Sequence, residues 1–362
     1  MNCLDGTSFK ILETLSRELG TEMSINQLTE RVRESYGSAY YANIYNKLQQ
    51  LAKENIVTIN KIGNTSIAKL NFDDQWIVDV LAQMEMQKKR AFLQETANQA
   101  MHFLFPDLER SFRDDLPFVR SISVIRPEKN QLINRAELLI LVKGRGMDPL
   151  PKQSDAELLH NTMKTLQMMQ SLKIDYLMLT EVKFLDLITT DEMNPAREML
   201  ADKITVFGPQ NFWHAIQVIA KKGIPLKITK SETAPPKLAE ADLVYNMARF
   251  GYNEMGTRIS QGKDICIEYI IAAMMAQGNA RRIEAVPVLL AKNSVNYDAL
   301  MFISRKIKRS ERLLGLLNVL ADIIPEKKDV EYAIKVMKEM RIKAKPADRS
   351  SILEKMRLYN AT

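Results

Sequence analysis

Residues 24–72 constrain the fold of this 362-residue chain more than any other stretch. They open with Ser24 and Gln27, three positions apart, just before an apolar repeat at helical spacing. At this spacing the serine side chain can accept a hydrogen bond from the glutamine amide, and the glutamine side chain can accept one from the serine amide. The pattern therefore predicts a capping box and an amphipathic helix that ends near Gly37.

A second helix and a hairpin are expected directly after this one. Ser38 has the residue type of an N-cap and predicts a helix over residues 39–54. Two short runs of alternating residues, 56–62 and 66–72, are joined by the turn 63–65, which contains a glycine and an asparagine. Alternation on both sides of such a turn is the pattern of a β-hairpin.

Together with an earlier helix over residues 9–19, this order of helix, helix, turn, helix and hairpin resembles the winged helix-turn-helix family over residues 1–72. In that family the third helix lies in the major groove of double-stranded DNA and the hairpin contacts the flanking backbone. Its members usually bind two half-sites as dimers, so the resemblance implies a homodimer. It also implies DNA contacts from the polar positions of the third helix and the wing: Ser38, Tyr40, Tyr41, Asn43, Asn46, Lys47, Lys61, Asn64 and Lys69.

Two other readings of this polar face remain open. Every surface helix has a solvated side, and winged helices also act as protein–protein interaction modules. Residues 1–72 contain eight Lys and Arg against seven Asp and Glu, so this part lacks the strong positive field of many DNA-binding domains.

Residues 73–106 are predicted to form one long connecting helix. Asp73 and Asp74 suggest an N-cap, and Pro106 is expected to end the helix. About 30 residues at 1.5 Å per residue span roughly 45 Å. The helix is expected to serve as a stalk or as a dimerisation element. Its apolar stripe comprises Trp76, Ile77, Val80, Leu81 and Met84.

Strand and helix patterns alternate through residues 107–222. Strands are predicted over 119–125, 136–142, 174–179 and 204–207, and helices over 155–172, 182–200 and 211–222. Strands connected by helical crossovers indicate a mixed α/β sheet covered by helices.

This region resembles the polymerase-beta-like nucleotidyltransferase fold, in its minimal branch. That family has a Gly-Ser turn after the first strand, two carboxylates one residue apart on the second, and a third carboxylate on a later strand. The carboxylates hold the two magnesium ions that act on the nucleotide. Here Arg126 and Pro127 stand at the Gly-Ser position, Arg135 and Glu137 at the carboxylate pair, and Asp175 at the third position.

The resemblance therefore implies a nucleotidyltransferase-like domain whose metal site is damaged. Arg135 would place a cation where a magnesium ion should bind, and at about 4 Å this repulsion amounts to several kcal/mol even with protein screening. We expect a non-catalytic domain with no cofactor. Glu137 and Asp175 are vestigial catalytic candidates, and they would bind magnesium and nucleotide only if the domain is an active nucleotidyltransferase. Arg126 and Arg135 are candidates for an anion pocket.

The rest of the chain reads as a basic linker over 223–237 and an all-helical bundle over 238–362. The fold expected for the whole chain is thus multidomain α+β: an N-terminal winged helix, a central mixed α/β nucleotidyltransferase-like sheet and a C-terminal all-α bundle.

Composition limits the remaining possibilities. The net charge of +7 favours contact with polyanions. Two cysteines are too few for a disulfide framework, and three separated histidines argue against a metal cluster, which together favour a cytoplasmic protein without a bound metal. No apolar run reaches the length of a membrane span. The function expected from the sequence is a DNA-binding transcriptional regulator with a non-catalytic sensor or scaffold domain.

Overall fold

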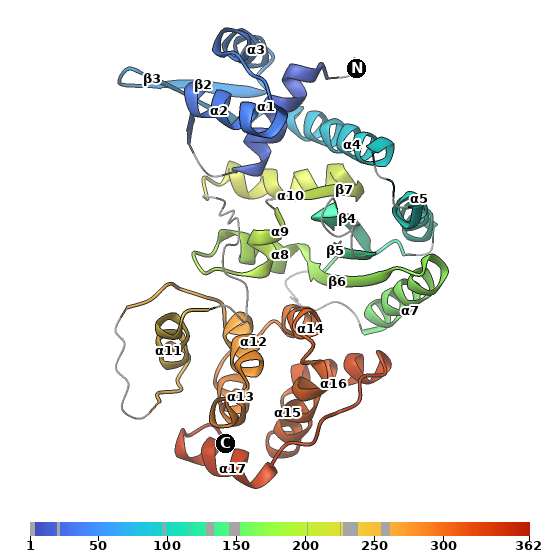
Figure 1. The fold of residues 1–362 in the computed structure, drawn as a ribbon, viewed down its shortest axis with the longest axis vertical. Coiled ribbons are helices and arrows are strands. Elements are labelled where there is room, and N and C mark those ends of the chain that lie inside the picture. The colour runs from blue at the N-terminus through green and yellow to red at the C-terminus, as the bar shows by residue number, and fades with distance from the viewer. Residues whose placement is uncertain are drawn as a thin grey trace.

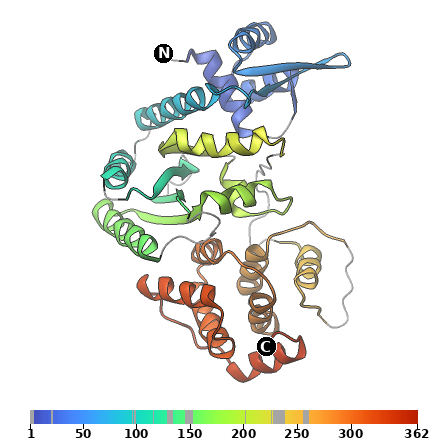
Figure 2. The same ribbon diagram turned by 180° about the vertical axis from the view of Figure 1, so that it is seen from behind.

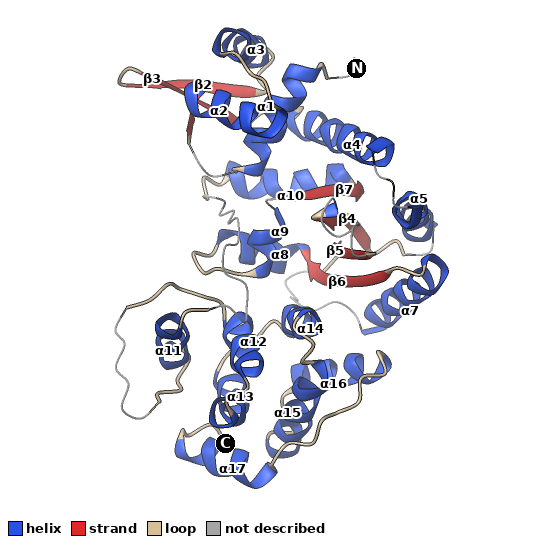
Figure 3. Ribbon diagram, viewed as in Figure 1, coloured by secondary structure: helices blue, strands red, loops and turns tan. Residues whose placement is uncertain are grey.

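The computed structural model describes residues 4–19, 22–95, 97, 99–114, 116–127, 134–144, 153–200, 202–224, 226, 238–254 and 261–362. The described chain is a mixed α+β protein with two small sheets. An N-terminal group of helices with a hairpin lies at one end, a four-stranded sheet covered by helices lies in the middle, and further helices form the other end (Figures 1 and 3).

The N-terminal part contains three helices and three short strands. The helices are α1 (Gly6–Arg17), α2 (Ile25–Tyr36) and α3 (Tyr41–Lys53), and the strands are β1 (Met23–Ser24), β2 (Val57–Ile62) and β3 (Thr65–Leu70). The strands pair antiparallel in the order β1-β3-β2. The predicted capping box is confirmed, because the Gln27 amide donates to Ser24 Oγ and the Ser24 amide donates to Gln27 Oε1. The predicted hairpin is confirmed as well.

The expectation that Ser38 caps the third helix is wrong. The helix begins at Tyr41, and its N-cap residue, Tyr40, makes no side-chain capping bond. Gly37 ends α2 in the left-handed conformation, with φ of 78°, and the chain then runs non-helically through Ala39. The Arg33 guanidinium donates to the Ala39 carbonyl, and the Ala39 side chain packs on the core, so residues 38–40 are held outside the helix.

The predicted single helix over 73–106 is also wrong, because α4 ends at Glu95 and α5 (Gln99–Asp114) runs past Pro106. Pro106 lies on the exposed side of α5. Because proline has no amide hydrogen, the carbonyl group one turn earlier in the helix lacks its usual donor, and on this side water can bond to it instead. The opposite face buries five large side chains at about 1.5–3 kcal/mol each, which outweighs a proline cost of about 3 kcal/mol. These side chains are Met101, Leu104, Phe105, Leu108 and Phe112.

The start of α4 (Ile77–Glu95) differs in detail from the prediction. Asp74 accepts a hydrogen bond from the Trp76 amide just ahead of the helix. Trp76 itself is 57 % exposed and does not belong to the buried stripe, whereas the other four predicted stripe residues are buried.

The central sheet has the strand order β6-β5-β4-β7, and its strands lie at the predicted positions. They are β4 (Val119–Ile125), β5 (Arg135–Val142), β6 (Lys173–Thr180) and β7 (Lys203–Phe207). β5 pairs parallel with β6 and antiparallel with β4, and β4 pairs antiparallel with β7, so the sheet is mixed. Because β5 is central and covered on both faces, residues 136–142 are apolar at almost every position.

Helices cover both faces of this sheet. Alternate side chains of β5 point to opposite faces: Leu138 and Ile140 pack with α5 and α7 (Gln153–Gln170), whereas Leu139 and Leu141 pack in a second core. That core includes α8 (Glu181–Thr189), α9 (Pro195–Leu200) and α10 (Pro209–Lys221).

The predicted helix over 182–200 is therefore two helices, α8 and α9. The Arg197 amide donates to Asn194 Oδ1 at the start of α9, and the Arg197 guanidinium donates to the carbonyls of residues 190–192. These bonds hold the residues between the two helices in a turn.

The C-terminal part of the described chain is helical, as predicted. Its helices pack together with the second face of the sheet in one core, which also extends to the N-terminal helices. None of the helices in the described ranges combines the length and apolar character needed to cross a membrane. In chain order they are α11 (Glu240–Arg249), α12 (Ile267–Gln277), α13 (Ala280–Lys292), α14 (Tyr297–Lys306), α15 (Ser310–Ile323), α16 (Lys328–Glu339) and α17 (Arg349–Leu358). Of the predicted linker 223–237, all but residues 223, 224 and 226 lies outside the described residues.

A buried ionic cluster joins the N-terminal helices to the central sheet. Lys203 Nζ of β7 lies 2.7 Å from Glu85 Oε1 of α4, and Glu85 Oε2 accepts from the Thr205 amide at 2.8 Å. Lys88 donates to the Lys203 carbonyl at 2.6 Å and lies 3.6 Å from Glu13 of α1. The cluster thus satisfies backbone groups of the edge strand β7 and ties α1, α4 and the sheet together.

Candidate functional site

The first candidate surface is the outer face of α3 with the adjoining hairpin. The inner face of α3 places Ile44, Leu48 and Leu51 in the core, as expected from their spacing. On the outer face Tyr41 is 47 % exposed, and Tyr40, the N-cap residue just before the helix, is 72 % exposed. Tyr41 and Tyr45 stack with their ring centroids 5.9 Å apart. The result is an aromatic and amide-rich surface at the N-terminal half of this helix.

The other predicted contact residues lie on the same part of the molecule. Asn43 and Asn46 are exposed on α3, and Ser38 is exposed just before it. Lys61, Asn64 and Lys69 are exposed on the hairpin β2–β3 and its turn. Ile62, beside the turn, is exposed as well. The hairpin projects away from the helices, which leaves its tip open to a partner (Figure 1).

Lys47 is the exception among these residues because it is engaged inside the protein. Its Nζ lies 2.9 Å from Asp5 Oδ2 and 2.6 Å from Gln50 Oε1. Partial burial acts to raise the pKa of Asp5, but bonds from the Ser8 amide and the Lys47 ammonium outweigh it and lower this pKa to about 2. Lys47 therefore links α3 to the start of α1 and contributes less positive charge to the surface than its sequence position suggests.

The second candidate site is a cluster of opposite charges at the N-terminal ends of β5 and β6. Glu137 and Asp175 are register partners on these parallel strands, and both are 3 % exposed. Arg135 Nη2 lies 3.3 Å from Glu137 Oε1 and 2.9 Å from Asp175 Oδ2. The structure thus brings together the arginine and the two carboxylates that the sequence singled out, and it places the guanidinium next to both carboxylates.

Two lysines complete this cluster. Lys173 Nζ lies 3.6 Å from Asp175 Oδ2, and Lys306 Nζ donates to Glu137 Oε2 at 3.1 Å. Burial lowers the pKa of Lys306, against the attraction of Glu137. Three cations therefore surround two carboxylates, so the cluster carries a net charge of about +1 when all five groups are ionised.

Lys306 comes from α14, and the sequence offered no sign of its role. It stands 169 positions from Glu137 and belongs to a basic run that reads as an ordinary solvated helix end. The neighbouring Arg305 donates to the Tyr176 carbonyl at 2.7 Å and lies over the Tyr176 ring. The end of α14 thus covers the edge of the sheet at this cluster.

Arg126, the other predicted anion-pocket residue, lies at the end of β4 in the left-handed region, with φ of 45°. Its amide donates to the Asp202 carbonyl, and its positive charge contributes to the lowered pKa of Lys306. Arg135 does not present an unpaired guanidinium beside it, because both carboxylates already contact that group. Within the described ranges, no group of three or more His, Cys, Asp or Glu side chains could hold a metal ion.

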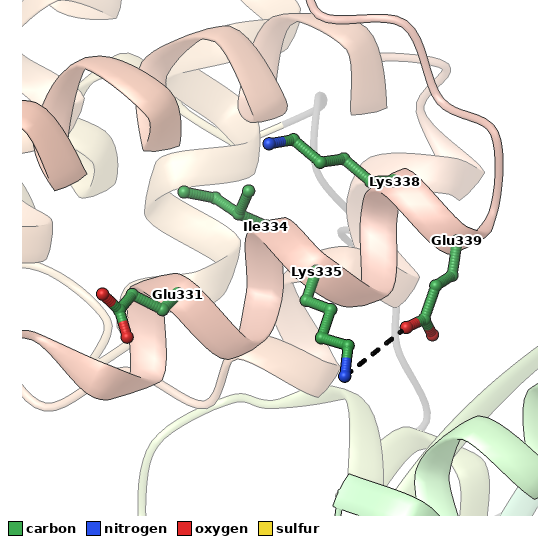
Figure 4. A pocket seen from close by; sticks show the side chains of 5 residues that line it. All are labelled: Glu331, Ile334, Lys335, Lys338 and Glu339. Carbon is green, nitrogen blue, oxygen red and sulfur yellow. Dashed lines mark ion pairs between the residues drawn. The ribbon is translucent and has the colours of Figure 1, made fainter.

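A shallow groove on α16 is a weaker candidate. It has a volume of about 510 Å³ and is lined by Glu331, Ile334, Lys335, Lys338 and Glu339 (Figure 4). All five residues come from one helix, with two acids balancing two lysines and one apolar side chain among them. Lys335 already pairs with Glu339 at 4.0 Å and with Glu157. The charged side chains of the groove therefore offer a ligand no net charge.

In comparisons with known proteins, no family model, curated protein or solved structure matches this chain.

Proposed function

We propose that this chain is a DNA-binding transcriptional regulator whose N-terminal residues form a winged helix-turn-helix. The observation that carries the proposal is the exposed tyrosine- and asparagine-rich face of α3 beside a projecting hairpin. Three features of the fold support it: the sheet order β1-β3-β2, the short connection between α2 and α3, and the packing of the opposite face of α3 in the core. In this arrangement α3 enters the major groove and the hairpin lies along the backbone.

The roles of individual residues follow from their chemistry. Asn43 and Asn46 carry amides that can bond base edges, and the rings of Tyr40 and Tyr41 can pack on thymine methyl groups. Lys61 and Lys69 of the hairpin can neutralise phosphates. Lys47 contributes indirectly, because its bond to Asp5 holds α3 against the start of α1. Binding as a homodimer would place two copies of α3 on two half-sites.

The central sheet acts in this proposal as a non-catalytic sensor or scaffold domain with a nucleotidyltransferase-like arrangement. Its support is the position of the Arg135 guanidinium, which lies within 3.3 Å of both carboxylates that would otherwise face a magnesium ion. Lys306 adds a second internal cation on Glu137. Incubation with magnesium and each of the four labelled nucleoside triphosphates is expected to yield no nucleotide transfer. Transfer that disappears in Glu137→Ala would establish the opposite, an active nucleotidyltransferase.

The test of DNA binding starts from a selection on random-sequence duplexes. Binding of the selected duplex is then measured by fluorescence anisotropy between 50 and 200 mM salt, concentrations at which phosphate contacts dominate the salt dependence. Asn43→Ala is expected to weaken binding by about 1–3 kcal/mol and to relax the base preference at one position. The combined change Lys61→Ala and Lys69→Ala is expected to weaken all sequences alike and to reduce the salt slope by about 2.

Two matched controls accompany these variants. Asn161→Ala removes an exposed amide from α7, and Lys338→Ala removes an exposed lysine from α16, both far from α3 along the chain. Neither is expected to change DNA binding. Absent binding, or binding that is independent of salt and equal in all variants, would refute the proposal. It would favour the other use of such a surface, in which the exposed tyrosines bind a partner protein.

A further inference from the structure

A cavity on the side of α4 lies apart from both candidate sites. It has a volume of about 620 Å³ and is formed by α4, α5, the edge strand β7 and the beginning of α10. These elements lie side by side in both ribbon views (Figures 1 and 2). The volume falls within the range of about 300–1,000 Å³ that is usual for small-molecule sites.

The charged residues that line the cavity are predominantly basic. Lys89 and Arg90 come from α4, Arg113 comes from α5, and Glu109 is the one acid among the described lining residues. Glu109 pairs with Lys89. Neither Arg90 nor Arg113 forms an ion pair with any residue of the described chain. Two positive charges therefore remain, and arginine keeps its charge at every physiological pH.

The rest of the wall is largely apolar. Met86 is 61 % exposed at the cavity, and Leu93 and Phe207 are partly exposed there, with Val206 and Pro209 beside them. An exposed methionine and an accessible aromatic ring cost free energy in water, and methionine adapts its shape readily to a bound molecule. The cavity thus combines an apolar wall with two unpaired guanidinium groups.

We propose that this cavity binds a small organic anion with an apolar body. Arg90 and Arg113 hold the anionic group, because the planar guanidinium forms paired hydrogen bonds with carboxylate, phosphate or sulfonate oxygens. Met86, Leu93 and Phe207 cover the apolar body. A nucleic-acid duplex is too large for 620 Å³, so this site is separate from the DNA-binding surface proposed above.

The experiment uses two fluorescent probes that differ only in their charged group. 1-Anilinonaphthalene-8-sulfonate carries a sulfonate, and N-phenyl-1-naphthylamine has the same rings without it. Titration of the full chain is expected to show one sulfonate probe bound per chain and at least tenfold weaker binding of the neutral probe. Arg90→Ala and Arg113→Ala are each expected to weaken the sulfonate probe about tenfold or more, since a hydrogen bond to a charged group contributes about 1.5–3 kcal/mol.

Matched variants separate this site from general surface binding. Arg110→Ala removes a 78 % exposed arginine from the same helix α5 without touching the cavity, and it is expected to leave both probes unaffected. Met86→Ala is expected to weaken both probes alike. All three arginines lie on the exposed side of their helices, so circular dichroism should show unchanged folding. The proposal is overturned if neither probe binds, if both bind equally well, or if the double variant Arg90→Ala, Arg113→Ala binds the sulfonate probe as the unchanged chain does.

Discussion

The buried ionic cluster between α4 and β7 allows a quantitative prediction for the substitution Lys203→Met. Methionine keeps most of the apolar volume of the lysine side chain but removes its charge. Among the described residues, Glu85, 1 % exposed, would then keep Lys88, 4.0 Å away, as its one charged partner. Removal of one partner from a buried ion pair typically costs 3–5 kcal/mol, because the remaining charge stays desolvated. We therefore expect Lys203→Met to lower the free energy of unfolding by about 3–5 kcal/mol.

The double variant Glu85→Leu, Lys203→Met distinguishes this reason from a general packing defect. It removes both charges, so the main cost of the single variant disappears. Two losses remain, because the Thr205 amide no longer has Glu85 Oε2 as its acceptor and Lys88 loses its 4.0 Å contact with Glu85. An unsatisfied buried amide costs about 1–3 kcal/mol. The double variant is therefore expected to be about 2 kcal/mol more stable than Lys203→Met alone.

Urea titration followed by the fluorescence of Trp213 measures both effects. Trp213 is 1 % exposed, and its ring centroid lies 4.9 Å from Lys203 Nζ, so its emission reports on this part of the core. A Trp76→Phe background removes the other tryptophan. The control is Lys183→Met, which breaks an exposed pair with Asp186 and is expected to cost about 1 kcal/mol or less. The reasoning is refuted if Lys203→Met costs no more than this control, or if the double variant is less stable than the single one.

Two further outcomes follow from the structure. Gly315→Ala is expected to destabilise the chain by about 1–3 kcal/mol or more in the same urea assay, since the added Cβ would lie 1.8 Å from the Lys345 carbonyl oxygen. The control is Gly6→Ala, because the space around a Cβ at Gly6 is open. Equal losses of stability in the two variants would contradict the close approach at Gly315. The Asp5 carboxyl is expected to titrate near pH 2 in NMR spectra, and Lys47→Ala should move this midpoint toward the ordinary value of 3.8. Because the pKa of Asp5 is lower in the folded state, its carboxylate contributes its full stabilisation of the fold above about pH 4, and this contribution is lost as the pH falls through 2. The contribution should stay below about 1 kcal/mol, because the Asp5 side chain is half exposed.

Sequence patterns predicted most of the helices and strands because these depend on short-range chemistry. The Ser24–Gln27 capping box, the hairpin around Gly63 and the four central strands were all predicted at or within a residue or two of their observed positions. In each case the deciding interactions lie within a few residues along the chain, or follow from the alternation of side chains on a strand.

The errors occurred where tertiary contacts outweighed local preference. Ser38 does not cap α3, because Arg33 and the core hold Ala39 outside the helix. Pro106 does not end α5, because the buried face of that helix continues beyond it. Trp76 was assigned to the buried stripe from spacing alone, but its position lies just before the helix begins.

In the candidate sites, too, some features follow from local sequence patterns and others depend on tertiary contacts. The sequence alone determined that α3 would bury one face and leave tyrosines and asparagines on the other, since helical periodicity decides which side chains share a face. It also pointed to Arg135, Glu137 and Asp175 as a group. Only the tertiary structure decided that Lys306 joins them, that Lys203 and Glu85 meet in the core, and that Arg90 and Arg113 face one cavity. Each of these contacts joins residues far apart along the chain, and the free energy that selects them comes from packing and desolvation, which no local pattern records.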